Sequence, residues 1–404
     1  MDRKTGSQNA WGELRRRDFL RVSALGSGAL VFGGSSLLTA CDPVTLKPAD
    51  ENGIRVHAFF DARVVATTGE AVEGTSYIWH RWPDGGGCFA LPDGGWSYVS
   101  NSEWFTTTPD GAGVSYLRFD AGGNIVDAGR CLDGTLINCA GGITPWDTWL
   151  SCEEYPGGSV WECHPLGAVP AVRRPAMGVF QHEAAACHTI EEAIYMTEDR
   201  SDGALYKFIP DTWGDLSSGT LQVLTEPQAG NLVWQTVPDP SGSPVPCKDQ
   251  VPDTKRFEGG EGIDISGQNV VFTTKRDNRV WSYSPAANSL TVMYDAAVNT
   301  SGVLSGVDNV ETSDAGVVYV CEDGGDMQIV LVRADGSTFP VVQIEDNPGS
   351  EICGAAFDPS GTRLYFSSQR NPGKTIEVSG PWAAFTEPGP LQLGRTDKGE
   401  EIQV

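Results

Sequence analysis

Hydrophobic and polar residues alternate along this chain in short segments that end in polar or charged residues. Each segment leads through a Gly-, Asp- or Asn-containing turn into a second hydrophobic segment. Alternation with a period of two is typical of β-strands, and no convincing amphipathic helix interrupts it. The pattern occurs six times, in residues 95–120, 148–165, 193–210, 269–285, 317–335 and 363–379.

The six copies are spaced very roughly fifty residues apart, which predicts an all-β fold, a six-bladed β-propeller with one blade per copy. An irregular β-sandwich is the less favoured alternative. Residues 211–255 are rich in Pro, Gly and Ser, and we expect them to hold outer strands of the third blade and a long surface loop. An early strand within residues 57–66 is expected to close the ring as an edge of the first or last blade.

The N-terminal residues carry two processing signals in the correct order. Arg16 and Arg17 begin a twin-arginine export pattern, and a Gly/Ser-rich apolar run leads to a lipobox that ends at Cys41. A transmembrane helix is the alternative, but the run is short for a stable span. We therefore expect a signal peptide (1–40), a linker (41–56), the propeller (57–385) and a C-terminal tail (386–404). The protein would lie in the cell envelope or periplasm, and a lipid on Cys41 would be its only membrane attachment.

The chain is strongly acidic, with a formal charge of −25. Removal of residues 1–40, which hold six basic and three acidic residues, would change this charge to −28. Such a charge argues against nucleic acid or anionic lipid headgroups as partners and suits cation binding, although a solvated acidic surface is the plain alternative. Nine cysteines remain besides Cys41, an odd number. At least one should stay unpaired in an oxidising compartment, and Cys139 is the best candidate.

A second motif precedes the charged turns and pairs a polar residue with small residues, as in His182-Glu183-Ala184-Ala185. The innermost strand of each propeller blade borders the central channel, so these residues should converge there. Two sets of candidate metal ligands follow. The first set is Cys139, Glu183, Glu261, Asp308 and Asn309; the second is Asn101 or Glu103, together with Glu153, Glu154, Glu198, Asp199, Glu322 and Asp323.

Converging carboxylates require cations or protons. Two carboxylates about 5 Å apart repel by roughly 3 kcal/mol at an effective dielectric near 20. Carboxylate oxygens suit Ca²⁺ or Mg²⁺, and a thiolate among them suits a transition metal such as iron or zinc. The alternative is that each carboxylate merely caps a turn and faces water.

Several of these motifs resemble the PhoX family of secreted alkaline phosphatases, over about residues 55–380. They are NCAGGITPWDTWLSCEE, FQHEAAA, YMTEDRSDGALYKFIP, FEGGEGI, VDNVE with VCEDGG, and ICGAAFDPSG. The resemblance implies twin-arginine export, a six-bladed propeller, and hydrolysis of small phosphomonoesters. It also implies Ca²⁺ and a dinuclear, oxo-bridged Fe³⁺ pair as cofactors. We expect a monomer.

The resemblance further implies roles for single residues. Cys139 would ligate iron, Glu183 and Glu261 would ligate metal, and the acidic turns would hold calcium or bridge metals. One departure stands out, because the family places a phosphate-holding Arg where this chain has Gly259. Arg276 is our candidate for the missing catalytic cation, beside Cys139, Glu183 and Glu261 as catalytic residues. Other candidates for that cation are Arg200, Lys275 and Arg370.

The departure at Gly259 leaves two other functions open. One is a different hydrolase on the same scaffold, such as a calcium-dependent lactonase or a phosphodiesterase. The other is a non-catalytic envelope lipoprotein with structural metals, since a fold does not fix a function.

Overall fold

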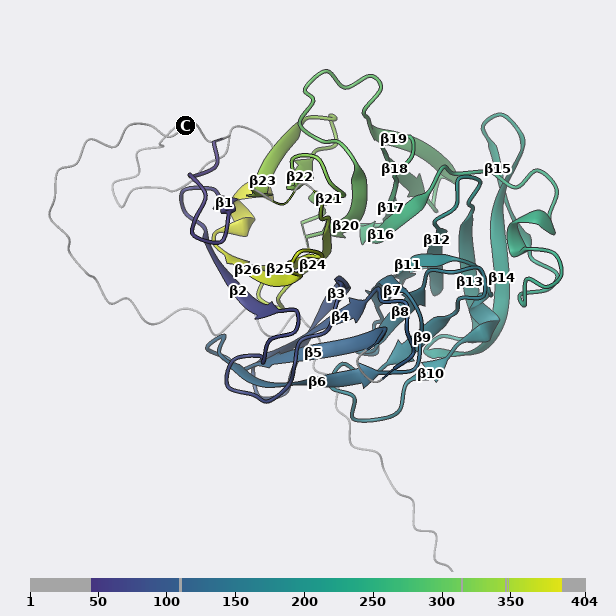
Figure 1. Ribbon diagram of the computed structural model, residues 1–404. Helices are drawn as coiled ribbons and strands as arrows, with labels where there is room; N and C mark the ends of the chain where they lie inside the picture. The colour runs from purple at the N-terminus through teal and green to yellow at the C-terminus, as the bar shows by residue number, and fades with distance from the viewer. Residues whose placement is uncertain (1–44, 109–110, 314, 346, 348, 387–404) are drawn as a thin grey trace, which may run out of the picture. The chain divides into compact units, whose positions relative to one another are not determined.

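The computed structural model describes residues 45–386 apart from 109–110, 314, 346 and 348. Its strands form six antiparallel sheets arranged around a central channel, as Figure 1 shows. The fold is therefore the expected all-β, six-bladed propeller. The predicted signal peptide, the lipobox at Cys41 and nearly all of the predicted C-terminal tail lie outside the described residues.

Each blade begins at the channel and proceeds outward. Blade 1 contains β3 (Pro83–Ala90), β4 (Trp96–Ser102), β5 (Gly113–Phe119) and β6 (Ile125–Leu132). Blade 2 contains β7 (Asn138–Ile143), β8 (Trp149–Glu153), β9 (Val160–Cys163) and β10 (Val172–Arg173). Blade 3 contains β11 (His182–His188), β12 (Ala193–Glu198), β13 (Leu205–Thr212), β14 (Asp215–Gln228) and β15 (Asn231–Thr236).

The second half of the ring follows the same plan. Blade 4 contains β16 (Gly260–Ser266), β17 (Asn269–Thr274), β18 (Arg279–Ser284) and β19 (Ser289–Asp295). Blade 5 contains β20 (Val307–Thr312), β21 (Val318–Glu322), β22 (Gln328–Val332), β23 (Thr338–Ile344) and the early strand β1 (Ile54–Val56). Blade 6 contains β24 (Ile352–Phe357), β25 (Arg363–Ser368), β26 (Lys374–Ser379) and β2 (Asp61–Thr67). Short 3₁₀ helices are η2 (Pro175–Met177), η3 (Cys247–Asp249) and η4 (Trp382–Thr386).

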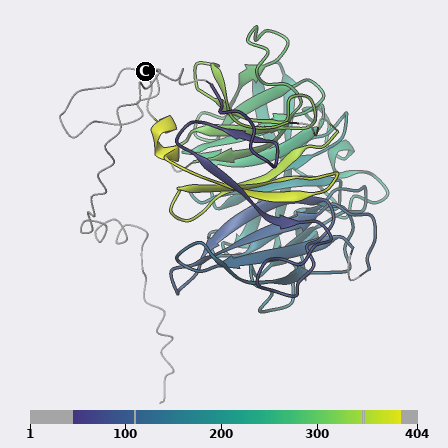
Figure 2. The same cartoon turned by 60° about the vertical axis from the view of Figure 1, so that its left-hand side comes forward.

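The ring closes through strands from the two ends of the described chain. β2 pairs with β26, with Asp61 opposite Ser379 and Thr67 opposite Lys374. Figure 2 shows the purple β2 beside the yellow strands of blade 6. This confirms the expected closure by an early strand. The predicted linker is not only a linker, however, because its last residues form β1, which adds to β23.

The hydrophobic core lies between neighbouring blades, where the faces of two sheets meet. One cluster joins Leu150 and Cys152 of blade 2 to Met196 and Tyr206 of blade 3. The second strand of four blades is buried along its whole length, as in β12 with the sequence AIYMTE, and in β17 and β25 every residue after the first is buried. Strands buried on both faces lose the alternation of half-buried strands, which explains the continuous apolar runs in the repeats.

All nine cysteines from Cys88 to Cys353 are described, and each is a free thiol. Cys139 is thus unpaired, in agreement with the expectation that some thiol is left over, but it shares that state with the others. Within the described ranges, no helix is long and apolar enough to cross a membrane.

Candidate metal and active site

Each innermost strand carries an irregularity near the channel. In β11 the register shifts between His182, opposite Glu198, and Ala185, opposite Met196. The equivalent shift occurs in the innermost strand of every other blade. A β-bulge re-aims the side chain at its centre. In five blades the first residue of the bulge is a potential metal ligand, namely Asp84, Cys139, Glu183, Glu261 and Asp308. In blade 6 the shift begins after Cys353, which still pairs with Ser367.

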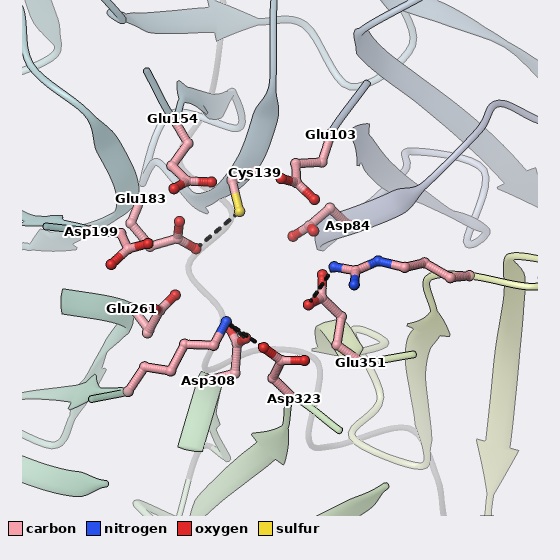
Figure 3. Close-up of a pocket in the computed structure, with 12 residues that line it drawn as sticks. Asp84, Glu103, Cys139, Glu154, Glu183, Asp199, Glu261, Asp308, Asp323 and Glu351 are labelled. Atoms are coloured by element: carbon pink, nitrogen blue, oxygen red, sulfur yellow. Dashed lines mark hydrogen bonds and ion pairs between the residues drawn. The ribbon is translucent and has the colours of Figure 1, made fainter. Parts of the chain in front are cut away.

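A second set of side chains comes from the residue that directly follows the second strand of each blade. These residues are Glu103, Glu154, Asp199, Lys275, Asp323 and Gln369. Apart from Cys353 and Gln369, the residues of both sets meet in one cavity of about 220 Å³. The cavity is lined by Asp84, Glu103, Cys139, Glu154, Glu183, Asp199, Glu261, Lys275, Asp308, Asp323, Glu351 and Arg370. Figure 3 shows the labelled acidic side chains and the Cys139 thiol around this common space.

Three predicted metal ligands point elsewhere. Glu153, Glu198 and Glu322 end their strands, one residue before the cavity-lining Glu154, Asp199 and Asp323. Successive side chains of a strand alternate between faces. The carboxylate of Glu322 accepts hydrogen bonds from the backbone N–H groups of Ser305 (2.7 Å) and Gln328 (3.0 Å).

Glu153 and Glu198 are placed in the same way. Glu153 accepts hydrogen bonds from the backbone N–H groups of Leu136 and Ser159, each at 3.2 Å. Glu198 accepts from the Ala204 N–H at 3.2 Å and also lies 3.5 Å from the Lys248 ammonium. These three predicted metal ligands therefore do not line the cavity, and each instead accepts hydrogen bonds from nearby backbone N–H groups.

Two further predicted residues lie beside the cavity without lining it. The Asn309 side-chain nitrogen donates to Asp308 Oδ1 (2.8 Å), while its oxygen accepts from the Gly354 N–H (3.0 Å). Arg276 has a side chain that is 51% exposed, with Nη2 3.7 Å from Asp199 Oδ1. Asn309 thus positions its neighbour, and Arg276 lies next to an acid of the cavity.

The cavity also contains residues outside the predicted set. Asp84 was missed because Pro83 and three glycines surround it and its blade lacks the acidic doublet of blades 2, 3 and 5. A search for an acid in the first strand of the hairpin that ends at Glu103 would have identified Asp84. Glu351, which directly precedes the ICGAAFDPSG motif, also lies outside the predicted set. Glu103, Lys275 and Arg370, considered as alternatives above, do line the cavity.

Burial and mutual repulsion perturb the acids of the cavity. Burial raises the pKa of Asp84 to about 8, and the Glu103 and Asp308 carboxyls add to the shift. Burial also raises the pKa of Glu103 to about 7 and that of Glu154 to about 8. The pKa values of Glu183, Glu261 and Glu351 are raised further, chiefly by burial and then by neighbouring acids.

The Cys139 thiol responds in the same way. Burial, followed by the negative charge of Asp84, raises its pKa well above the usual value. Its Sγ donates a hydrogen bond to Glu183 Oε1 (3.3 Å). In the absence of a cation, the site therefore favours the protonated thiol and protonated carboxyls.

Several observations fit bound metal ions. Glu183 and Glu261 are 0% and 3% exposed, yet Glu183 Oε2 and Glu261 Oε1 receive no hydrogen bond from the described part of the chain. Buried polar atoms normally have partners. The candidate ligand atoms of Cys139, Glu154 and Glu183 lie within 4.8 Å of one another, as do those of Glu183, Glu261 and Asp308. Two further triplets meet this distance: Asp84 with Glu351 and Cys353, and Asp308 with Asp323 and Glu351.

Polar side chains of one blade hold the bulge of the next. The Thr197 hydroxyl donates to the Glu261 carbonyl (2.5 Å), and the Thr273 hydroxyl donates to the Asp308 carbonyl. In blade 1, the buried Asn101 amide donates to the Cys139 carbonyl (2.9 Å) and the Ala140 carbonyl (2.8 Å). Asn101 is thus a support for Cys139 and not one of the residues that line the cavity.

The fold and cavity define the class of this protein: a six-bladed β-propeller with an acidic, thiol-containing site in its channel that could hold metal ions. The sequence matches the family model described as alkaline phosphatase PhoX, over residues 111–163 and 158–289. These residues include Cys139, Glu154, Glu183 and Glu261. A comparison with curated proteins gave no match.

Two solved structures are similar to this chain in fold. The structure of Pseudomonas fluorescens PhoX in complex with vanadate, a transition state analogue, is similar with a TM-score of 0.69 and 15% identity, over 83% of this chain and 97% of that chain. A protein of unknown function from Bacteroides thetaiotaomicron is similar with a TM-score of 0.52 and 9% identity, over 79% and 76%. At these identities the structures support the six-bladed fold, and the family model confirms the resemblance to PhoX.

Proposed function

We propose that this protein is a metal-dependent hydrolase of phosphomonoesters. The observation that carries the proposal is the cavity, in which buried carboxylate oxygens without a hydrogen-bond donor lie beside a thiol, in a chain that matches the PhoX family model over residues 111–163 and 158–289. Such a site is poorly suited to bind a phosphate by itself, since nine carboxyl groups line it and only two cationic side chains do. Metal ions would invert this local charge and allow an anionic substrate to enter.

The metal ligands would come mainly from the bulges. Cys139, Glu183 and Glu261 would hold metal together with Glu154 and Asp199, and Asp84 is a further oxygen donor. The thiol favours a transition metal and the carboxylates favour calcium, in line with the Fe³⁺ pair and Ca²⁺ that the family resemblance implies. Bound metals would polarise phosphoryl oxygens and lower the pKa of a water molecule. The bulges, held by Asn101, Thr197 and Thr273, would fix the ligand geometry.

Arg276 is our candidate for the guanidinium that holds phosphate. Gly259, where the family resemblance leads one to expect Arg, has φ +77°, and a Cβ built there would lie 3.2 Å from Arg276 Cγ and 3.4 Å from its Nε. The Arg276 side chain therefore passes over the space that a side chain at position 259 would enter. Its backbone is held there by a hydrogen bond from the Arg276 N–H to the Glu258 carbonyl (3.1 Å).

The test is a rate assay on metal-loaded protein with a chromogenic phosphomonoester, a phosphodiester and a lactone. We expect turnover of the monoester that is lost in chelator and restored by calcium plus iron. Folded, metal-containing protein without monoester turnover would refute the proposal. Faster turnover of the diester or the lactone would instead indicate the alternative hydrolases that the glycine at position 259 suggested.

We also propose export by the twin-arginine route and a lipid on Cys41, on the basis of the sequence signals alone. Mass spectrometry of protein from the cell envelope would test this. The expected N-terminal residue is a lipid-modified Cys41, and the Cys41→Ser variant should be released from membranes. An intact N-terminus, or membrane attachment of the variant, would contradict the proposal. A monomer without affinity for nucleic acid is expected in solution.

A further inference from the structure

The negative charges of the cavity are balanced unequally. On one side, Lys275 Nζ lies 3.1 Å from Asp308 Oδ2 and 2.6 Å from Asp323 Oδ2. Arg370 Nη2 lies 2.9 Å from Glu351 Oε2. Asp308, Asp323 and Glu351 form one of the carboxylate groups whose atoms lie within 4.8 Å of one another. The protein therefore supplies its own cations to a group that could otherwise hold a metal ion.

No cationic side chain of the described residues lines the opposite side of the cavity, although the half-exposed Arg276 lies 3.7 Å from Asp199 there. Cys139, Glu154, Glu183 and Glu261 take part in no salt bridge with any described residue. Glu154 accepts one hydrogen bond from the Gln181 amide (2.9 Å), and one oxygen each of Glu183 and Glu261 has no donor among the residues that the structure describes. The carboxylates without a cationic partner are therefore those that lie beside the Cys139 thiol.

The position of Lys275 in the repeat adds a second argument. Lys275 follows the second strand of blade 4, where blades 1, 2, 3 and 5 place Glu103, Glu154, Asp199 and Asp323. One acid of the ring is thus replaced by an ammonium group. The Arg370 guanidinium is also fixed, because its Cζ lies 4.9 Å from the centre of the Trp82 ring. Stacking on the ring and the ion pair with Glu351 together hold this guanidinium in the wall of the cavity.

We propose that Lys275 and Arg370 occupy the place of metal ions at Asp308, Asp323 and Glu351, and that bound metal is confined to the side formed by Cys139, Glu154, Glu183 and Glu261. This inference rests on the proposed function only in assuming that the cavity binds metal. An ammonium group contributes one positive charge and three donors, which suits contacts to two carboxylates. The site would hold fewer metal ions than its number of carboxylates suggests.

The experiment is elemental analysis of purified protein after identical loading with calcium and iron. We expect the Lys275→Met variant to bind at least one more divalent ion per chain than the wild type, since Asp308 and Asp323 lose their ammonium partner. The Lys255→Met variant is the matched control, because Lys255 Nζ makes a similar 2.5 Å contact to Glu226 outside the cavity. It should leave the metal content unchanged.

A second variant keeps the inference testable if Lys275→Met does not fold. Asp323→Asn should leave the metal content of the wild type unchanged, whereas Glu183→Gln should lower it. A loss of metal in Asp323→Asn, or an unchanged count in a folded Lys275→Met, would show that the ammonium leaves when metal binds, and would overturn the inference. Metal binding without phosphatase activity would refute the proposed function and leave this inference intact.

Discussion

The Cys139 thiol and the Glu183 carboxylate come from the innermost strands of neighbouring blades and meet at 3.3 Å. Both residues stand at the start of a β-bulge, which turns their side chains into the channel. The contact therefore depends on two blades packing side by side and on the same irregularity in each strand.

Replacement of Cys139 by Ser should lower metal affinity and phosphatase activity by at least about tenfold, since a hydroxyl is a poorer transition-metal ligand than a thiolate. Iron should be affected more than calcium. Metal titration and kcat/KM on the same preparations would measure this. Cys187→Ser is the control, because Cys187 lies on β11 like Glu183 but does not line the cavity. Equal effects of the two substitutions would argue against a ligand role for Cys139.

The hairpin carboxylates should behave in the opposite way. Glu322→Ala removes the acceptor of two backbone N–H groups, so the free energy of unfolding should fall by about 1–3 kcal/mol or more. Metal content per folded chain should stay the same, because Glu322 faces away from the cavity. Denaturant unfolding and elemental analysis would test both statements. Loss of metal without loss of stability would contradict the structural role.

Metal-free protein should become less stable as the pH rises from about 5 to 8. In the folded chain, the pKa is raised to about 8 for Asp84 and Glu154 and to about 7 for Glu103. The same groups titrate near pH ~4 when unfolded. The folded chain thus binds more protons over this interval, and each such carboxyl lowers the free energy of unfolding by about 1.4 kcal/mol per pH unit.

Thermal unfolding between pH 5 and pH 9, with and without metal, would measure this effect. Metal ligands bind in their deprotonated form, so loading should remove the decrease or reverse it. The Asp84→Asn variant should show a shallower decrease in its metal-free state. A melting temperature of the metal-free wild type that stays level or rises with pH would contradict the expectation.

The arginine at the cavity rim should act on substrate and not on the fold. Arg276→Ala should lower kcat/KM for a phosphomonoester by about 10²-fold or more, since hydrogen bonds to a charged group contribute roughly 1.5–3 kcal/mol each. Arg276→Lys should recover part of the loss, because a point charge remains but the planar fork does not. An unchanged kcat/KM in both variants would show that Arg276 is a solvated surface residue without a role in substrate binding. Inhibition by inorganic phosphate should weaken in parallel.

The supports between blades should matter for both stability and metal binding. Thr197→Val keeps the shape of the side chain but removes the donor to the Glu261 carbonyl, so we expect a loss of about 1–2 kcal/mol in stability and weaker metal binding. Thr291→Val is the matched control, since the Thr291 hydroxyl bonds to Ser282 in an exposed position. Calorimetric metal titration of the two variants would separate them.

The sequence was sufficient to predict the architecture, because six copies of one strand pattern can be counted without knowing any contact. It was also sufficient to find Cys139, Glu183, Glu261 and Asp308, which share a motif with small residues. It could not decide between Glu153 and Glu154. Both are acidic, and only the end of β8 determines that the second of them faces the cavity.

Two other limits have physical causes. Asp84 has no acidic doublet after its hairpin, so the pattern that marks blades 2, 3 and 5 does not point to it. The partners of Lys275 and Arg370 depend on side-chain directions across blades, and no local pattern encodes those. The acids Asp323 and Glu351 come from different blades and meet these cations only when the ring is closed.

Ring closure by β1 and β2 has a consequence for how the protein is made. These strands are synthesised first, but their partners β23 and β26 appear only near the end of translation. Asp84 also depends on a residue made late, because the Gln369 amide nitrogen donates a hydrogen bond to it at 2.5 Å across 285 positions of the chain. A nascent chain that has not reached blade 6 therefore has an open cavity, and its β2 has no partner strand. The channel site is thus formed only when all six blades are present, because its lining residues run from Asp84 to Arg370.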